Sequence, residues 1–187
     1  MLDRFKHFWQ SVMLAPFVNT FIRLGISPDA VTLVGTLGVS AGALVFFPQG
    51  KLLTGVLVIT AFVFSDLIDG AMARATGTSS KFGAFFDSTL DRIGDGAIFG
   101  GLVLYFAGPG DSYLYLCLTL YCLVMGAVTS YARAKAESLG MNAEGGLAER
   151  ADRIVAILVM TGLGALFDLP ILMYVTIWVL ALSLIHI

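Results

Sequence analysis

Six long apolar runs, separated by short polar links, restrict the fold of this chain more than any other feature. The runs cover residues 29–47, 52–75, 82–107, 113–132, 151–167 and 170–187. Each is close to the roughly 20 residues that a helix needs to cross a bilayer. With 58% hydrophobic residues and a mean hydropathy of +0.89, the composition excludes an ordinary soluble domain. We therefore predict one all-α integral membrane domain over residues 1–187, with six transmembrane helices in residues 29–187.

Residues 1–25 are predicted to form a juxtamembrane amphipathic helix on the membrane surface. Leu2, Phe5 and Trp9 belong to an apolar stripe, whereas Arg4 and Lys6 face away from it. After this segment, Ser27, Pro28 and Asp29 form a helix-start signal, because a capping residue followed by proline is typical of a first helical turn. On physical grounds alone Asp29 is interpreted as a cap of the first span.

Small residues predict close helix packing in two of the spans. Gly35, Gly38 and Gly42 recur at three- and four-residue spacing in the first span. Gly96 and Gly100 form a similar pair in the third span. Glycine at such spacing lets two helix backbones approach closely in a membrane.

Four carboxylates flank the polar link between the second and third spans. Asp69 and Asp87 are each nine residues from Thr78 at the centre of this link, and Asp66 and Asp91 are twelve and thirteen residues away. Asp66 and Asp69 are three residues apart, and Asp87 and Asp91 four, so each pair lies on one helix face. If the two spans form an antiparallel hairpin, the four side chains converge near one membrane surface.

A group of intramembrane carboxylates needs compensation, because each charge costs roughly 2.5–3.5 kcal/mol to insert. Protons or a cation can supply it. With only oxygen ligands and neither histidine nor cysteine nearby, the group suits Mg²⁺, Mn²⁺ or Ca²⁺ better than zinc. The alternative is that some of these aspartates cap helices or lie in interfacial water. Asp95 lies one turn beyond Asp91. It can support the site through hydrogen bonds or have a purely structural role in its helix.

The central pattern resembles the signature of the CDP-alcohol phosphatidyltransferases at every position. It reads Asp66-x-x-Asp69-Gly70-x-x-Ala73-Arg74, eight residues, then Gly83-x-x-x-Asp87-x-x-x-Asp91. The resemblance implies transfer of a phosphatidyl group from CDP-diacylglycerol to an alcohol, with release of CMP. It implies two Mg²⁺ or Mn²⁺ ions on Asp66, Asp69, Asp87 and Asp91, with Asp91 also the general base, although spacing alone would allow any of the four to be the base.

The same resemblance implies a pocket for the CDP-lipid. Its residues would be Asp29, Thr32, Asp66, Gly70, Ala73, Arg74 and Gly83. Arg74 is placed to pair with a phosphate, and its alternative role is to extend toward the membrane interface. The two glycines remove side chains where a nucleotide or a neighbouring helix must come close.

Four cations in the link between the fourth and fifth spans indicate an acceptor that carries a phosphate. They are Arg133, Lys135, Arg150 and Arg153. Arg150 and Arg153 start a helix, where cations oppose the macrodipole, so local helix stability does not explain them. The alternative is ordinary positive-inside bias with contacts to anionic membrane lipids.

This link resembles that of the actinobacterial phosphatidylinositol phosphate synthases, which implies inositol 1-phosphate as the acceptor. The shared runs are Ser130-Tyr-Ala-Arg133-Ala-Lys135-Ala-Glu137 and Glu149-Arg150-x-x-Arg153. Glycerol 3-phosphate, the acceptor of phosphatidylglycerophosphate synthases, is the second candidate, and the archaeal-type inositol phosphate transferases are a third. A divalent-cation transporter is the alternative from another class, although its conduction path would need polar groups reaching the other leaflet.

The distribution of basic residues predicts the orientation in the membrane. All but Lys51 lie before the first span, around the second-to-third link or around the fourth-to-fifth link. By the positive-inside rule, both termini and the aspartate site face the cytoplasm, in the plasma membrane. Small-residue faces favour a homodimer, and no nucleic-acid partner is expected. The last run reaches Ile187 without the basic residues expected after a cytoplasmic exit, so we expect the natural chain to continue.

Overall fold

The computed structural model describes residues 16, 18–63, 65–77, 80–142 and 150–184, without the side chains of residues 65–67. All regular structure in these ranges is helical. Residues 18–23 are helical, and most of the predicted surface helix, at residues 1–15 and 17, lies outside the described residues. The larger elements are α2 (Pro28–Phe46), the short 3₁₀ helix η1 (Phe47–Gln49), α3 (Leu52–Val63), α4 (Ser65–Thr76), α5 (Lys81–Ala107), α6 (Tyr113–Ser138), α7 (Arg150–Leu166) and α8 (Ile171–Ser183).

Among the described residues, three stretches of helix are both long and apolar enough to cross a membrane. They are Pro28–Gln49, Leu52–Thr76 and Tyr113–Ser138, of 22, 25 and 26 residues. The second combines α3 and α4, which lie on either side of residue 64. α5 has 27 residues, enough for about 40 Å of helix, but its first half carries four charged side chains. α7 and α8, at 17 and 13 residues, are shorter than the usual span.

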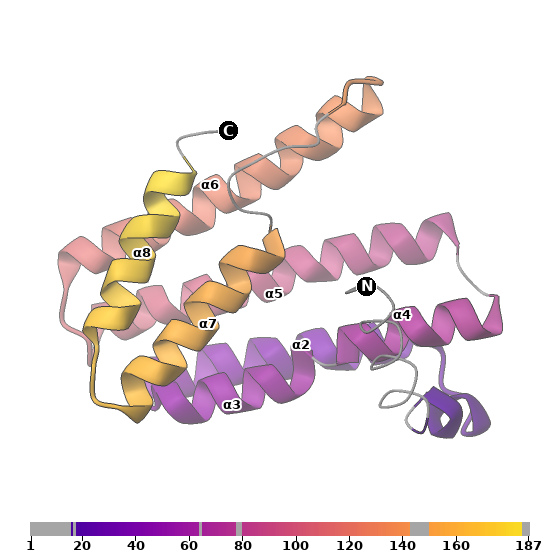
Figure 1. The fold of residues 1–187 in the computed structure, drawn as a ribbon, viewed down its shortest axis with the longest axis horizontal. Helices are drawn as coiled ribbons and strands as arrows, with labels where there is room; N and C mark the ends of the chain where they lie inside the picture. The colour runs from indigo at the N-terminus through magenta and orange to yellow at the C-terminus, as the bar shows by residue number, and fades with distance from the viewer. Residues whose placement is uncertain (1–15, 17, 64, 78–79, 143–149, 185–187) are drawn as a thin grey trace, which may run out of the picture.

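α2 lies at the centre of the packing and connects the two arms of the aspartate hairpin. It packs against α3, α4 and α5, while α7 covers α3 and α8 joins α7 to α6. Figure 1 shows α4 ending and α5 beginning at the same end of the molecule, so the two helices are antiparallel, and α7 and α8 lie toward the other end. The predicted antiparallel hairpin is therefore present, and α2 supports both of its arms.

The predicted helix-start signal is confirmed, but the separate interpretation of Asp29 as a cap is wrong. The Ser27 hydroxyl accepts a hydrogen bond from the Ala30 amide at 3.3 Å, and Pro28 stands in the first turn. Asp29 follows inside the helix and is not the cap. α5 begins in a similar way, because the Ser80 hydroxyl accepts from the Gly83 amide at 2.9 Å.

The predicted glycine packing is confirmed in α2 and wrong in α5. Gly35 and Gly42 are buried, and a Cβ at Gly42 would lie 3.0 Å from the Ile59 side chain. At Gly96 and Gly100 a Cβ would meet no described atom within 4 Å. The close approach of α5 to α2 occurs instead at Gly101, where a Cβ would lie 2.6 Å from the Ala43 carbonyl oxygen.

Many large apolar side chains lie on the outside of the bundle. Examples are Leu37, Leu57 and Val124, which are each more than half exposed. In the most apolar window of α6 only 11% of the residues are buried. Such surfaces are stable in contact with lipid or with another apolar protein surface.

Candidate active site

Asp69 is the most deeply buried carboxylate of the predicted site. It lies on α4 and is only 7% exposed. The Thr32 hydroxyl of α2 donates a hydrogen bond to Asp69 Oδ2 at 2.5 Å. Thr32 itself is buried and also lies 3.1 Å from the carbonyl oxygen of Pro28, one turn earlier. The packing of α2 on α4 therefore fixes one oxygen of this carboxylate.

Aspartates of three helices lie within electrostatic range of one another. Asp29 and Asp87 lie close enough for their charges to act on Asp69, and the charge of Asp87 also acts on Asp91. A Cβ at Gly83 would lie 3.7 Å from Oδ1 of Asp29, so the first turn of α5 approaches the first turn of α2. Asp87 is exposed, while Asp91 is partly buried. The solvent exposure of the aspartates thus falls from Asp87 at the open edge of the site to Asp69 in its interior.

The remaining members of the central motif lie on α4. The backbone places Asp66 one turn before Asp69, and the side chain of Asp66 lies outside the described residues. Arg74 is exposed and folds back over Gly70, where a Cβ would lie 3.4 Å from Arg74 Nη1. Ala73 is partly buried beside it. Among the side chains that the structure describes, no three His, Cys, Asp or Glu groups are close enough to hold a metal ion.

Arg150, the first residue of α7, is bound to two carboxylates of α5. Its Nη1 lies 2.6 Å from Asp91 Oδ2, and its Nη2 donates to the Asp91 carbonyl oxygen at 3.1 Å. Its Nε and Nη2 donate to the two oxygens of Asp95 at 2.8 and 2.7 Å. Asp91 and Asp95 are one helical turn apart, so a single guanidinium reaches both.

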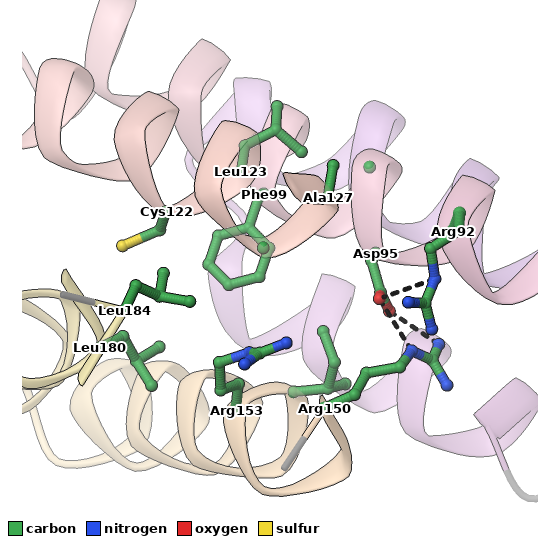
Figure 2. A pocket seen from close by; sticks show the side chains of 13 residues that line it. Arg92, Asp95, Phe99, Cys122, Leu123, Ala127, Arg150, Arg153, Leu180 and Leu184 are labelled. Atoms are coloured by element: carbon green, nitrogen blue, oxygen red, sulfur yellow. Dashed lines mark hydrogen bonds and ion pairs between the residues drawn. The ribbon is translucent and has the colours of Figure 1, made fainter. Parts of the chain in front are cut away.

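Arg153 lies one turn further along α7 and lines a pocket between α5, α6, α7 and α8. Figure 2 shows its side chain lying below Phe99, while Arg150 reaches Asp95 on the other side of the pocket. Arg92 also contributes to this pocket, and its Nε lies 3.8 Å from Asp95 Oδ2. The pocket therefore has a cationic side next to the aspartates and an apolar side.

Arg133 and Lys135 lie apart from Arg150 and Arg153. Both are exposed on the last turns of α6, and Arg133 Nε donates to Glu137 at 3.0 Å. Figure 1 shows this end of α6 well away from the start of α7. Residues 143–149, which connect the two helices, lie outside the described residues. The described structure thus brings two of the four predicted acceptor cations to the aspartates.

Two features of the site could not be found from the sequence. The partnership of Arg150 with Asp91 and Asp95 joins residues more than fifty positions apart, and no spacing rule predicts it. The sequence assigns Arg92 only to the basic residues that set the membrane orientation, and nothing in it indicates the position of Arg92 in the pocket beside Asp95. The one usable signal was the four-residue spacing of Asp91 and Asp95, which places both on the same face of α5.

An apolar pocket opens beside Asp91. Its walls come from α2, α3, α5 and α7 and include Val39, Val63, Ile98 and Leu158, with Asp91, Asp95 and Arg150 at its polar end. A molecule with a charged head and hydrocarbon chains matches this combination of surfaces.

Named bacterial proteins are similar to the chain over most of its length. The phosphatidylinositol phosphate synthase of Streptomyces avermitilis is 48% identical, covering 98% of this chain and 78% of that protein. The phosphatidylinositol phosphate synthase of Cutibacterium acnes is 49% identical, covering 91% and 83%.

Solved structures agree with these similarities. The crystal structure of Mycobacterium tuberculosis phosphatidylinositol phosphate synthase with CDP-DAG bound matches with a TM-score of 0.88 and 39% identity, over 92% of this chain and 88% of that one. The structure of the same enzyme in complex with manganese and citrate matches with a TM-score of 0.86 and 38% identity, over 93% and 84%. The family model for CDP-alcohol phosphatidyltransferases covers residues 25–186, and the chain is a member of this enzyme family.

Proposed function

We propose that the protein transfers the phosphatidyl group of CDP-diacylglycerol to inositol 1-phosphate, giving phosphatidylinositol phosphate and CMP. The observation that carries this proposal is the full aspartate motif set on α4 and α5 in a chain whose named relatives are phosphatidylinositol phosphate synthases. Membership of an enzyme family favours this reading over a divalent-cation transporter.

The donor set fits a hard divalent cation. Asp69, Asp87 and Asp91 offer only oxygen ligands, and their charges already act on one another. We propose that these residues and Asp66 hold two ions, either Mg²⁺ or Mn²⁺. When bound, the metal would neutralise the pyrophosphate of the donor so that a hydroxyl can attack the phosphorus.

The residues around the aspartates supply binding and proton transfer. As the acceptor oxygen bonds to phosphorus, the bond from phosphorus to the CMP oxygen breaks, and Asp91 takes the proton of the attacking hydroxyl. Arg74 is assigned to a donor phosphate. Asp29, Thr32, Gly70, Ala73 and Gly83 are assigned to the nucleotide side of the same pocket, where the two glycines leave room for close approach. The apolar pocket beside Asp91 is assigned to the lipid part of the donor.

The acceptor phosphate is assigned to Arg153. Arg133 and Lys135, which lie apart from Arg153 on the last turns of α6, are assigned to attracting the anionic acceptor toward the site. Arg153 supports this assignment because it lines a pocket together with Asp95 and Arg150. A neutral acceptor would not need a cation there, whereas a phosphate pairs well with a guanidinium. Arg150 was predicted together with these cations and is considered separately below.

The six helical segments α2, α3 with α4, α5, α6, α7 and α8 are proposed as six transmembrane spans. We place the site and both termini on the cytoplasmic face of the plasma membrane, where activated lipid and soluble inositol 1-phosphate meet. A homodimer is proposed because the most apolar window of α6 is only 11% buried within one chain.

CMP release by the purified protein tests the reaction. The protein would receive CDP-diacylglycerol and Mg²⁺ with inositol 1-phosphate, free inositol, glycerol 3-phosphate or serine, and Asp91→Asn would be the control. Turnover with inositol 1-phosphate alone, lost in the variant, is expected. Turnover with glycerol 3-phosphate instead would make the protein a phosphatidylglycerophosphate synthase, and no CMP from any acceptor would contradict the proposal.

A further inference from the structure

Arg150 uses most of its hydrogen-bonding capacity within the protein. A guanidinium has five N–H donors. The contacts to Asp91 Oδ2, the Asp91 carbonyl and both oxygens of Asp95 occupy four of them. With respect to the described residues, one donor on Nη1 is left for a ligand. This is a poor basis for binding a phosphate, which is recognised best by two parallel donors of one guanidinium.

The two carboxylates contact Arg150 in different ways. Asp95 forms a two-pronged contact at 2.7 and 2.8 Å, in which both of its oxygens are engaged. Asp91 contributes a single carboxylate oxygen at 2.6 Å. The side chains of Arg150, Asp91 and Asp95 are 32%, 22% and 21% exposed, so these contacts are partly shielded. Asp95 therefore fixes the plane of the guanidinium, and the guanidinium fixes Asp91.

We propose that Arg150 and Asp95 are positioning residues for Asp91. The inference deepens the proposed function, in which Asp91 is a metal ligand and the base. Arg150 holds Asp91 Oδ2, which leaves Oδ1 as the oxygen assigned to the reaction. Asp95 acts only through Arg150. Arg150 thus differs from Arg153, which lines the neighbouring pocket and is assigned to the acceptor phosphate.

Arg150→Lys tests this role with the charge preserved. A lysine ammonium is a point charge and cannot reproduce the planar fork that reaches both carboxylates. We expect Arg150→Lys to weaken Mn²⁺ binding to the substrate-free protein by about 10–100-fold, the usual effect of losing a residue that orients a metal ligand. Electron paramagnetic resonance of free Mn²⁺ measures this binding without any turnover. Asp95→Asn should have a similar effect, and the double variant should be no worse than either single variant.

Two other variants serve as comparisons. Arg153→Lys should leave Mn²⁺ binding within twofold of the unmodified protein and raise the KM for inositol 1-phosphate. Asp111→Asn, at the exposed turn between α5 and α6, should change neither quantity. In turnover assays, Arg150→Lys should lower kcat by about 10–100-fold with an acceptor KM within twofold, because a misplaced group costs rate rather than binding.

The outcomes separate this inference from the proposed function. Unchanged Mn²⁺ affinity in Arg150→Lys and Asp95→Asn would overturn the positioning role. A fall in the apparent Tm alone would show only that the contacts of Arg150 with Asp91 and Asp95 hold α7 against α5. A raised acceptor KM with unchanged kcat in Arg150→Lys would show that Arg150 binds the acceptor phosphate instead. Weakened Mn²⁺ binding in a protein that releases no CMP would support the positioning role and contradict the proposed reaction.

Discussion

Thr32 and Asp69 illustrate how one hydrogen bond can keep a buried carboxylate in place. An unpaired carboxylate as buried as Asp69 would be costly, and the Thr32 hydroxyl, 2.5 Å from it, satisfies one of its oxygens. Hydrogen bonds to charged groups contribute roughly 1.5–3 kcal/mol. The same bond sets the direction in which the other oxygen of Asp69 points.

Thr32→Val is expected to impair the site with little change in shape. The substitution removes the hydroxyl and leaves Asp69 Oδ2 without this donor, so the carboxylate loses its fixed orientation. We expect the Mg²⁺ concentration for half-maximal CMP release to rise by about tenfold or more, the range seen for residues that orient metal ligands. The measurement is a Mg²⁺ titration of the rate at saturating CDP-diacylglycerol.

Thr119→Val is the matched control, because the buried Thr119 hydroxyl has no hydrogen-bond partner in the described structure. Removing a buried, unpaired hydroxyl should leave the Mg²⁺ dependence unchanged and keep or raise the apparent Tm. If the two variants changed the Mg²⁺ dependence equally, the bond between Thr32 and Asp69 would have no special role.

Individual residues also show how far sequence reasoning extends. The three- and four-residue spacing of the aspartates predicted that each pair lies on one face of its helix, because helical periodicity is a local property. Ser27 forms the capping bond that the sequence pattern assigned to Asp29. Both residue types cap helices, and the sequence cannot rank two such residues two positions apart without the backbone geometry. The contacts of Arg150 with α5 depend on how α7 docks, which no local pattern encodes.

At the scale of elements, the contact between α2 and α5 places the aspartates of two helices on one site. The two backbones come close at Gly101, beside the carbonyl of Ala43. The sequence indicated glycine packing in both helices but selected Gly96 and Gly100 in α5. Glycines occur on adjacent faces of α5. The rotation of α5 about its own axis relative to α2 decides which of these glycines contacts the α2 backbone.

Gly101→Ala is expected to destabilise the protein, and Gly100→Ala is not. The new Cβ at residue 101 would lie 2.6 Å from a backbone oxygen, so α2 and α5 must move apart, at a cost of about 1–3 kcal/mol. At residue 100 the Cβ meets nothing within 4 Å, and alanine improves helix propensity by about 1 kcal/mol. Thermal unfolding of the two variants in detergent should therefore shift in opposite directions. Equal shifts would mean that the helices are not in this contact.

At the scale of the whole molecule, the polar links alternate between two ends. α4 and α6 end on the side of the molecule where α5 begins, while η1 and the turn between α5 and α6 lie at the far ends of α2 and α5 (Figure 1). The distribution of basic residues relates these ends to the two sides of a membrane, because Lys51 is the only basic residue on the η1 side among the described residues.

Cysteine labelling of intact cells tests this orientation. In a background of Cys117→Ala and Cys122→Ala, single cysteines would replace Gln49 and Tyr113 at one end and Lys81 and Leu139 at the other, all of which are exposed. We expect a membrane-impermeant maleimide to label positions 49 and 113 directly, and positions 81 and 139 only after permeabilisation. The reverse pattern would place Asp69 and Asp91 outside the cell, where CDP-activated lipid is not made, and the proposed reaction would lose its donor. Labelling of all four positions from outside would contradict the spanning arrangement itself.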